Sequence, residues 1–125
     1  MNIEVSNAEI LDKLSILKLK LKFINDPVKN FNIQREYDYI NNISKALISN
    51  NTIITLYEQL LEINQILWNI EDQIRKKEQN KTFDEEFIQL ARQVYITNDK
   101  RAEIKKQINV ISQSKFIEEK FYEKY

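Results

Sequence analysis

Hydrophobic residues recur at helical spacing along most of the chain. Ser6-Asn7-Ala8-Glu9 predicts the start of a first helix, because the serine hydroxyl can accept from a first-turn amide while Glu9 reaches back. This helix continues to about Ile24. Its main apolar stripe is Ile10, Leu14, Leu17, Leu21 and Ile24, and a second stripe on nearly the opposite face is Ile16, Leu19 and Phe23. Such a helix is either central in its bundle or shared with another subunit, and we favour the shared contact slightly.

Asn25-Asp26-Pro27 predicts the end of the first helix, because the residue before a proline leaves the helical region and proline has no amide donor. A second helix is predicted over about residues 30–48. Asn50-Asn51-Thr52 ends it and caps the helix that follows. The inner face of the second helix carries Ile33, Tyr37, Ile40, Ser44 and Leu47.

The second half of the chain predicts a long antiparallel helical hairpin. A third helix covers about residues 52–78, a turn follows at Asn80-Lys81, and Thr82-Phe83-Asp84-Glu85 is typical of a capping box that opens a fourth helix ending near Ile111. The tail, residues 112–125, is expected to be coil or a short helix folded back on the bundle. No segment shows the sustained alternation of a strand. We therefore predict an all-α, up-and-down bundle of about four helices in a single domain, residues 1–125.

The packed face of this hairpin turns polar partway along both helices. The third helix presents Ile53, Tyr57, Leu60, Asn64, Leu67, Glu71 and Ile74, with Trp68 and Arg75 alongside. The fourth presents Phe87, Ala91 and Val94, then Asn98, Arg101 or Ala102, and Lys105. Counting from the turn places Asn64 opposite Asn98, Glu71 near Ala91 and Arg92, Trp68 near Val94 and Tyr95, and Lys105 level with Tyr57 and Glu58.

These polar positions have two interpretations. A buried Asn pair can fix the register of the bundle, and Glu71 can pair with Arg75 or Arg92, because a carboxylate removed from water must be paired. Alternatively, the cationic side chains line a cleft for an anionic small molecule, with Glu71 as base or orienting group. The cationic set is Arg75, Arg92, Arg101 and Lys105, which Asp12 and Lys13 of the first helix could join. We favour the structural interpretation.

Composition excludes several classes of chemistry. The chain has no cysteine, no histidine and no glycine. Disulfides, thiolate nucleophiles, histidine bases and glycine-rich phosphate loops are therefore absent. We expect no cofactor and no metal; magnesium held by carboxylates alone is a weak alternative, because neighbours such as Glu71 and Asp72 point about 100° apart on a helix.

Charge and hydropathy limit the partners and the cellular location that we expect. The chain carries 19 basic and 19 acidic residues, so a nucleic-acid partner is not expected. The lysine-rich run from Lys13 to Lys22 alternates with Leu and Ile, and we interpret it as a solvated face. No apolar run is long enough for a membrane span, and the amino terminus lacks the features of a secretory signal. We expect a cytoplasmic protein.

Five stretches of the chain, in order, resemble a family known only as domain of unknown function 6165. They are residues 9–17 (EILDKLSIL), Asn64 and residues 67–72 (LWNIED) with Arg75, residues 87–95 (FIQLARQVY), residues 98–105 (NDKRAEIK) with Ile108-Asn109, and Glu118-Glu119-Lys120 with Tyr122 and Tyr125. The chain departs from the family pattern at Ala8, where a glycine is expected, at Ser15 and at Phe121. The resemblance implies a bacterial or phage-type cytoplasmic protein and brings no activity with it.

The sequence therefore leaves two functions open. The first is a non-catalytic interaction or oligomerisation module that self-associates through the first helix or the tail. The alternative is a binder or small metal-free enzyme for an anionic metabolite such as a phosphate, sugar nucleotide or dicarboxylate. Its candidate site residues are Asp12, Lys13, Trp68, Glu71, Arg75, Arg92, Asn98, Arg101 and Lys105, with Glu71 the candidate catalytic group.

Overall fold

The computed structural model describes residues 1–121, and within them the fold is entirely helical. The elements are α1 (Asn7–Phe23), α2 (Pro27–Ser44), a short 3-10 turn η1 (Leu47–Ser49), α3 (Asn51–Gln79) and α4 (Glu85–Ile111). The predicted all-α bundle dominated by a long hairpin is confirmed. Among the described residues, no helix combines the length and apolar character needed to cross a membrane.

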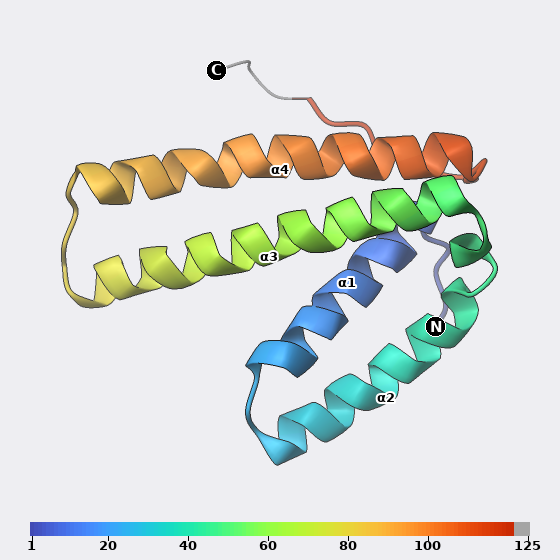
Figure 1. Ribbon diagram of the computed structural model, residues 1–125, viewed down its shortest axis with the longest axis horizontal. Coiled ribbons are helices and arrows are strands. Elements are labelled where there is room, and N and C mark those ends of the chain that lie inside the picture. Colours follow the sequence, from blue (N-terminus) through green and yellow to red (C-terminus); the bar gives the residue numbers. More distant parts are fainter. Residues whose placement is uncertain (122–125) are drawn as a thin grey trace.

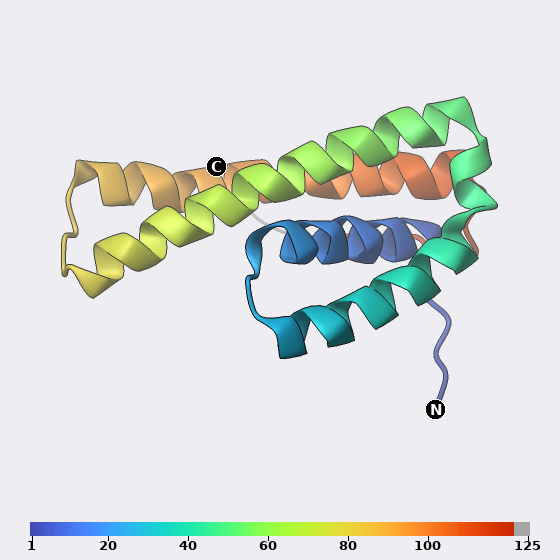
Figure 2. The ribbon, with the colours of Figure 1, turned by 60° about the horizontal axis from the view of Figure 1, so that its bottom comes forward.

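The four helices form two antiparallel pairs of unequal length. The long α3 and α4 lie side by side, and the shorter α1 and α2 pack at one end of them at an angle (Figures 1 and 2). α1 contacts all three other helices. Leu14, Leu17 and Leu19 are buried by these contacts, whereas Phe23 is 40% exposed. The contacts within one chain support the central position, and the contact with another subunit, which the sequence slightly favoured, stays a prediction.

The first helix is capped as predicted, whereas the second begins earlier than predicted. The Ser6 hydroxyl accepts from the Glu9 amide at 3.2 Å and α1 starts at Asn7. The predicted start of the second helix near residue 30 is wrong, because Asp26 caps it by accepting from two first-turn amides and Pro27 occupies its first position. A proline is well suited to that position, since its fixed φ is helical and its missing donor is not needed.

The start of α4 also differs from the prediction. The cap is Asp84, which accepts from the Phe87 amide at 2.9 Å, and not Thr82. Lys77 of α3 pairs with Asp84 at 3.0 Å and with Glu86 at 3.2 Å, which ties the two helices together beside the turn. Since the chain has no glycine, Lys81 supplies the left-handed backbone position of this turn, with φ 52°.

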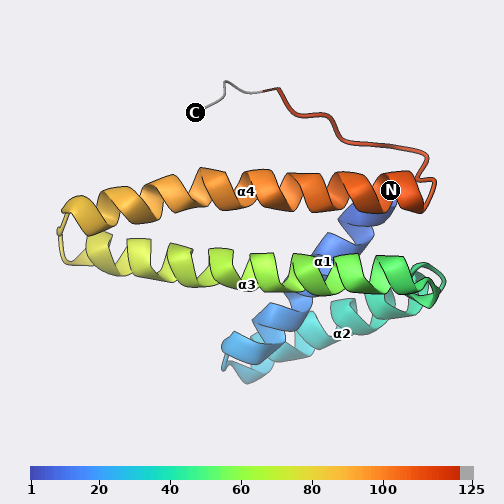
Figure 3. The same cartoon turned by 45° about the horizontal axis from the view of Figure 1, so that its top comes forward.

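The hydrophobic core occupies only one end of the molecule. Its buried residues come from α1, the first three turns of α3 and the end of α4: Ala8, Leu11, Leu14, Ile53, Leu56, Leu60 and Ile108. Beyond this core, residues 66–79 and 85–96 continue as a two-helix projection, here called the arm (Figures 1 and 3). Within the arm only Ile70 is buried, at 8% exposure.

The tail turns back after α4 without forming a helix over residues 115–121 (Figure 3). Gln113 adopts a left-handed backbone with φ 55°, and the Ser114 amide donates to the Asn109 carbonyl at 2.8 Å. The tail then runs along α4, where Glu119 pairs with Lys106 at 3.2 Å. The coil alternative is therefore the correct one for these residues, while Tyr122 and Tyr125 lie outside the described part.

Candidate functional site

Asp12 of α1 is the centre of a polar cluster between α1, α3 and α4. Its side chain is only 5% exposed. Arg101 of α4 donates to it twice, through Nε to Oδ1 at 3.2 Å and through Nη2 to Oδ2. Two-point contact of this kind fixes both side chains and is stronger than a single neutral hydrogen bond. Lys105 Nζ lies 3.5 Å from the same carboxylate.

Lys105 extends the cluster towards the start of α1. Its ammonium group donates to Glu9 Oε1, and its side chain is only 12% exposed. Glu118 of the tail lies 3.8 Å from Lys105. Burial acts to raise the pKa of Glu118, but attraction by Lys105 and Lys120 outweighs it and the pKa falls below its usual value. Glu9 and Asp12 thus offset the two cations, and Glu118 adds a third carboxylate.

Asn64 joins the cluster from α3, which corrects the predicted pairing with Asn98. Its amide nitrogen donates to Asp12 Oδ1 at 2.9 Å and to Ser15 Oγ at 2.7 Å. Ser15 in turn donates to the Asp12 carbonyl at 2.7 Å. The prediction placed Asn64 against α4 because it assumed that only α3 and α4 meet at this level, whereas α1 covers the polar stripe of α3.

A second group of polar contacts joins the start of α1 to the end of α4. The buried Asn109 accepts from the Ala8 amide at 2.8 Å, and Asn7 donates to Ser112 and Ser114 at 2.9 and 3.0 Å. The side chain at position 8 is fully buried.

The sequence analysis missed Ser15 and Asn109 as members of the site and gave Glu9 only a capping role. Two signals could have found them. Ser15 lies four residues after Leu11, on the same side of the helix, and Asn109 belongs to the Ile108-Asn109 pair that resembles the family.

Five of the predicted site residues do line one open cleft of about 440 Å³ beside this cluster. α1 supplies one wall through Ile16 and Leu19, and α3 and α4 supply the others. The predicted residues in it are Trp68, Glu71, Arg75, Asn98 and Arg101, together with Asn64, Leu67 and Asp72. Trp68 stacks on Phe23 of α1, with ring centroids 5.4 Å apart. The polar residues of the hairpin therefore open to solvent on the side of α1.

Glu71 does not form the ion pair that the sequence predicted. It is exposed, and within the described residues neither Arg75 nor Arg92 lies within ion-pair distance of it. Arg92 is likewise exposed and lines neither cleft described here. Because Glu71 stays in water, burial does not require a counter-charge for it. Arg75, Glu71 and Asp72 all line the cleft from the part of α3 that belongs to the arm.

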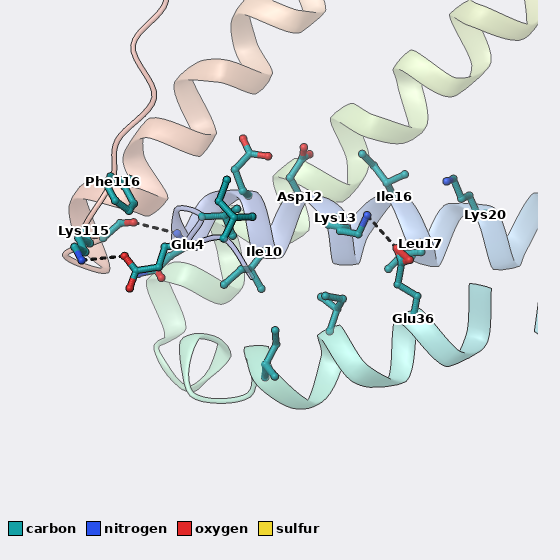
Figure 4. Close-up of a pocket in the computed structure, with 17 residues that line it drawn as sticks. Glu4, Ile10, Asp12, Lys13, Ile16, Leu17, Lys20, Glu36, Lys115 and Phe116 are labelled. Atoms are coloured by element: carbon teal, nitrogen blue, oxygen red, sulfur yellow. Dashed lines mark hydrogen bonds and ion pairs between the residues drawn. The ribbon is translucent and has the colours of Figure 1, made fainter. Parts of the chain in front are cut away.

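Lys13 lies on the other side of α1, away from this cleft. It pairs with Glu36 of α2 at 3.0 Å and lines a larger cleft of about 650 Å³ between α1, α2, the amino-terminal residues and the tail (Figure 4). Lys115 pairs with Glu4 at 2.9 Å on the far wall. The remaining lining is mainly aliphatic, with Ile10, Leu17 and Ile40 among it. Most charges at this cleft are thus paired within the chain.

The polar groups of the cluster already have hydrogen-bond or ion-pair partners within the chain, which limits their capacity to bind a ligand. Among the described residues, the buried side-chain polar atom without a hydrogen-bond partner is Asn30 Oδ1, which belongs to α2. Arg101 and Lys105 already contact carboxylates, so each would have to give up an ion pair to hold an anion. Within the same residues, no group of three carboxylates is placed to hold a metal ion.

The comparisons with known proteins identify the family. The family of unknown function DUF6165 matches residues 1–125, and the chain belongs to it. The resemblance of the ordered motifs is thereby confirmed over the whole length. Neither the comparison with curated proteins nor that with solved structures finds a match.

Proposed function

We propose that this protein is a non-catalytic helical interaction module that associates with itself through the arm. One observation carries the proposal. The core residues of α3 end at Leu60, but α3 itself continues to Gln79 and α4 returns beside it over the same length. The arm alone spans about 20 Å, at roughly 1.5 Å per residue over the residues from 66 to 79. A projection of this length contributes little to the core of its own chain.

Two helices cannot bury all the apolar side chains of the arm. They share a single seam, whereas an amphipathic helix carries an apolar stripe at least about 100° wide. Large side chains outside that seam remain exposed or half-buried, among them Ile66, Trp68, Phe87, Ile88 and Tyr95. Helical hairpins of this kind are stabilised when further helices cover them. The proposed interface therefore lies on the arm, because α1 already packs against the three other helices of its own chain.

The alternative function, binding of an anionic metabolite, has weaker support from the geometry. Arg101 and Lys105 are offset by Asp12 and Glu9, and the remaining cation of the 440 Å³ cleft, Arg75, lies close to two carboxylates, Glu71 and Asp72, among the lining residues. An anion entering this cleft would meet little net positive charge.

We also propose that the protein is cytoplasmic, which fractionation of cells that express it would check.

Light scattering coupled to size-exclusion chromatography tests the proposal. The expected result is a mass that rises above 15.1 kDa from low micromolar to submillimolar concentration. Ala91→Arg places a long charged side chain on the exposed α4 surface of the arm and should leave a monomer. Gln93→Arg is the matched control, since it makes the same addition on an exposed position two residues away.

Three outcomes decide between the possibilities. A parent protein that stays monomeric at every concentration contradicts self-association. Association that survives Ala91→Arg contradicts the arm as the interface. A chain ending at Ser114 should still associate; loss of association on that truncation would place the contact in the tail instead.

A further inference from the structure

We infer that the partner on the arm is a second copy of this chain, packed antiparallel, so that Glu71 of each copy pairs with Arg75 of the other. This inference rests on the proposed self-association and specifies its symmetry. One face of the arm carries the argument. It is here called the open face, and its residues are Trp68, Glu71 and Arg75 on α3, and Phe87, Ala91 and Val94 on α4.

Hydrogen bonds at the base of the hairpin define which way the open face points. Asn64 of α3 and Arg101 of α4 both bind Asp12 of α1, so both point towards α1. On α3, positions 68, 71 and 75 lie four, seven and eleven residues after Asn64, which keeps them on the same side of the helix. On α4, positions 94 and 87 lie seven and fourteen residues before Arg101, and position 91 lies seven residues before Asn98, which lines the same cleft. The open face is thus the surface that α1 covers at the base and leaves uncovered along the arm.

The length of the uncovered part sets where a partner can lie. α1 ends at Phe23, whose ring stacks on Trp68, and α3 ends at Gln79. On the open face, residues 69–79 of α3 are therefore not covered by α1. The midpoint of this uncovered stretch is residue 74. An antiparallel partner centred there would use the same uncovered stretch of its own arm. The end of its α1, which is level with position 68, would then lie at about position 80, at the tip of the first arm.

The charges on α3 are centred at nearly the same point. Glu71 and Arg75 lie one helical turn apart, are both exposed and form no ion pair within the described residues. Their midpoint is residue 73. A twofold axis through this level brings each Glu71 to the partner's Arg75 and each Arg75 to the partner's Glu71. Each Glu71 and each Arg75 thereby gains one partner, and the dimer contains two such ion pairs.

The packing on α4 is centred at the same level. Lys77 contacts Asp84 and Glu86, so position 77 of α3 is level with about position 85 of α4. Position 73 is then level with about 89, which is the midpoint of Phe87 and Ala91. The same axis therefore places the half-buried ring of Phe87 against the exposed methyl group of the partner's Ala91. A large side chain facing a small one is the arrangement that lets two helices approach closely.

The proposed dimer interface is small, so we expect dimerisation to be weak. Eleven residues of each helix overlap, so two helices about 10 Å wide meet over roughly 16 Å by 20 Å. Interfaces of this size belong to the weak, reversible class. We expect a monomer–dimer equilibrium that depends on concentration and on salt, because exposed ion pairs are screened.

Complementary charge reversal tests the antiparallel pairing. Glu71→Lys alone should weaken dimerisation about tenfold, because it places two cations together at both symmetric contacts, and Arg75→Glu alone should do the same with two anions. An equimolar mixture of the two variants should recover the parental dissociation constant, since each variant then offers the opposite charge to the other. Sedimentation equilibrium measures all three. Glu62→Lys is the control, an equal charge change at an exposed position of α3 before the arm.

The outcomes separate this inference from the proposed function. If Ala91→Arg abolishes dimerisation but mixing restores nothing, self-association through the arm stands and the antiparallel pairing is wrong. If Glu62→Lys weakens dimerisation as much as Glu71→Lys, the effect is one of net charge and the inference fails. Recovery in the mixture together with an unaffected control supports it. A strictly monomeric parent removes both proposals.

Discussion

Substitution of Asp12 by asparagine tests whether the polar cluster locks α1 onto the hairpin. Asparagine has nearly the same shape as aspartate, so the change removes charge and leaves volume unchanged. In the parent protein the carboxylate accepts from Asn64 at 2.9 Å and from Arg101 at 3.2 Å, and Lys105 lies 3.5 Å away. After substitution, Arg101 loses its counter-charge and Lys105 loses one of its carboxylate partners.

The magnitude follows from the burial of the cations. Removing one partner of a buried ion pair costs about 3–5 kcal/mol. The Arg101 side chain is 26% exposed and can reach water, and Lys105 retains Glu9, so the loss should fall at or below the low end, roughly 2–3 kcal/mol. For 125 residues the unfolding entropy is about 0.26 kcal/mol per degree, which converts this loss to a decrease of about 8–12 °C in Tm.

Urea and thermal unfolding followed by far-ultraviolet circular dichroism measure this loss. Asp38→Asn is the matched control, because Asp38 is exposed on α2 and contacts Gln34. The control should change the free energy of unfolding by less than about 0.5 kcal/mol. The double variant Asp12→Leu with Arg101→Met should recover much of the loss, since it removes both charges and keeps apolar volume. A loss below about 1 kcal/mol for Asp12→Asn would contradict the assigned role of the cluster.

Two further predictions concern the half-buried phenol of Tyr57 and the backbone of the α3–α4 turn. Burial, and next the nearby Tyr37, raises the pKa of Tyr57 from 10.0 to about 12, so the folded state keeps a proton that the unfolded state releases. The contribution of Tyr57 to the free energy of unfolding should therefore decrease as pH rises from 10.0 towards 12, and Tyr57→Phe should make the dependence in urea unfolding less steep across that range. Lys81→Gly should stabilise the protein by about 0.5–1 kcal/mol, because it relieves the left-handed backbone of the turn, whereas Lys100→Gly within α4 should destabilise it by about 1 kcal/mol.

Most of the fold was predictable from local signals. The apolar stripes, the Asn50 cap and the proline at position 27 were enough to find four helices and the hairpin. The errors fell where one residue has two possible roles. Asp26-Pro27 ends one helix and also begins the next, and Asp84 is a better cap than Thr82 because its carboxylate also meets Lys77. The lowered pKa of Asp84 has this origin, first in the Phe87 amide and then in Lys77.

The candidate site was predictable only in part, because helical spacing gives the direction of a side chain and not the identity of its neighbour. Asn98 and Arg101 were placed on the correct face, and both line the cleft beside α1. Which helix covers that face depends on the packing of the two pairs, which counting from the hairpin turn cannot supply. Asn64 therefore received the wrong partner, and Asp12 appeared only as an addition to the site of which it is the centre.

The polar stripe of α3 illustrates how one pattern can serve two environments. Asn64 and Glu71 are seven residues apart on the same side of the helix, and the sequence predicts one buried site for both. α1 covers the first and ends before the second, so Asn64 is buried in a complete hydrogen-bond network while Glu71 remains in water. If the stripe were purely structural it would need to be polar only under α1. The stripe continues past Trp68 to Glu71 and Arg75, which lie on the uncovered stretch. This difference supports separate roles: Asn64 holds α1 against α3, and Glu71 and Arg75 form the proposed contact with a second chain.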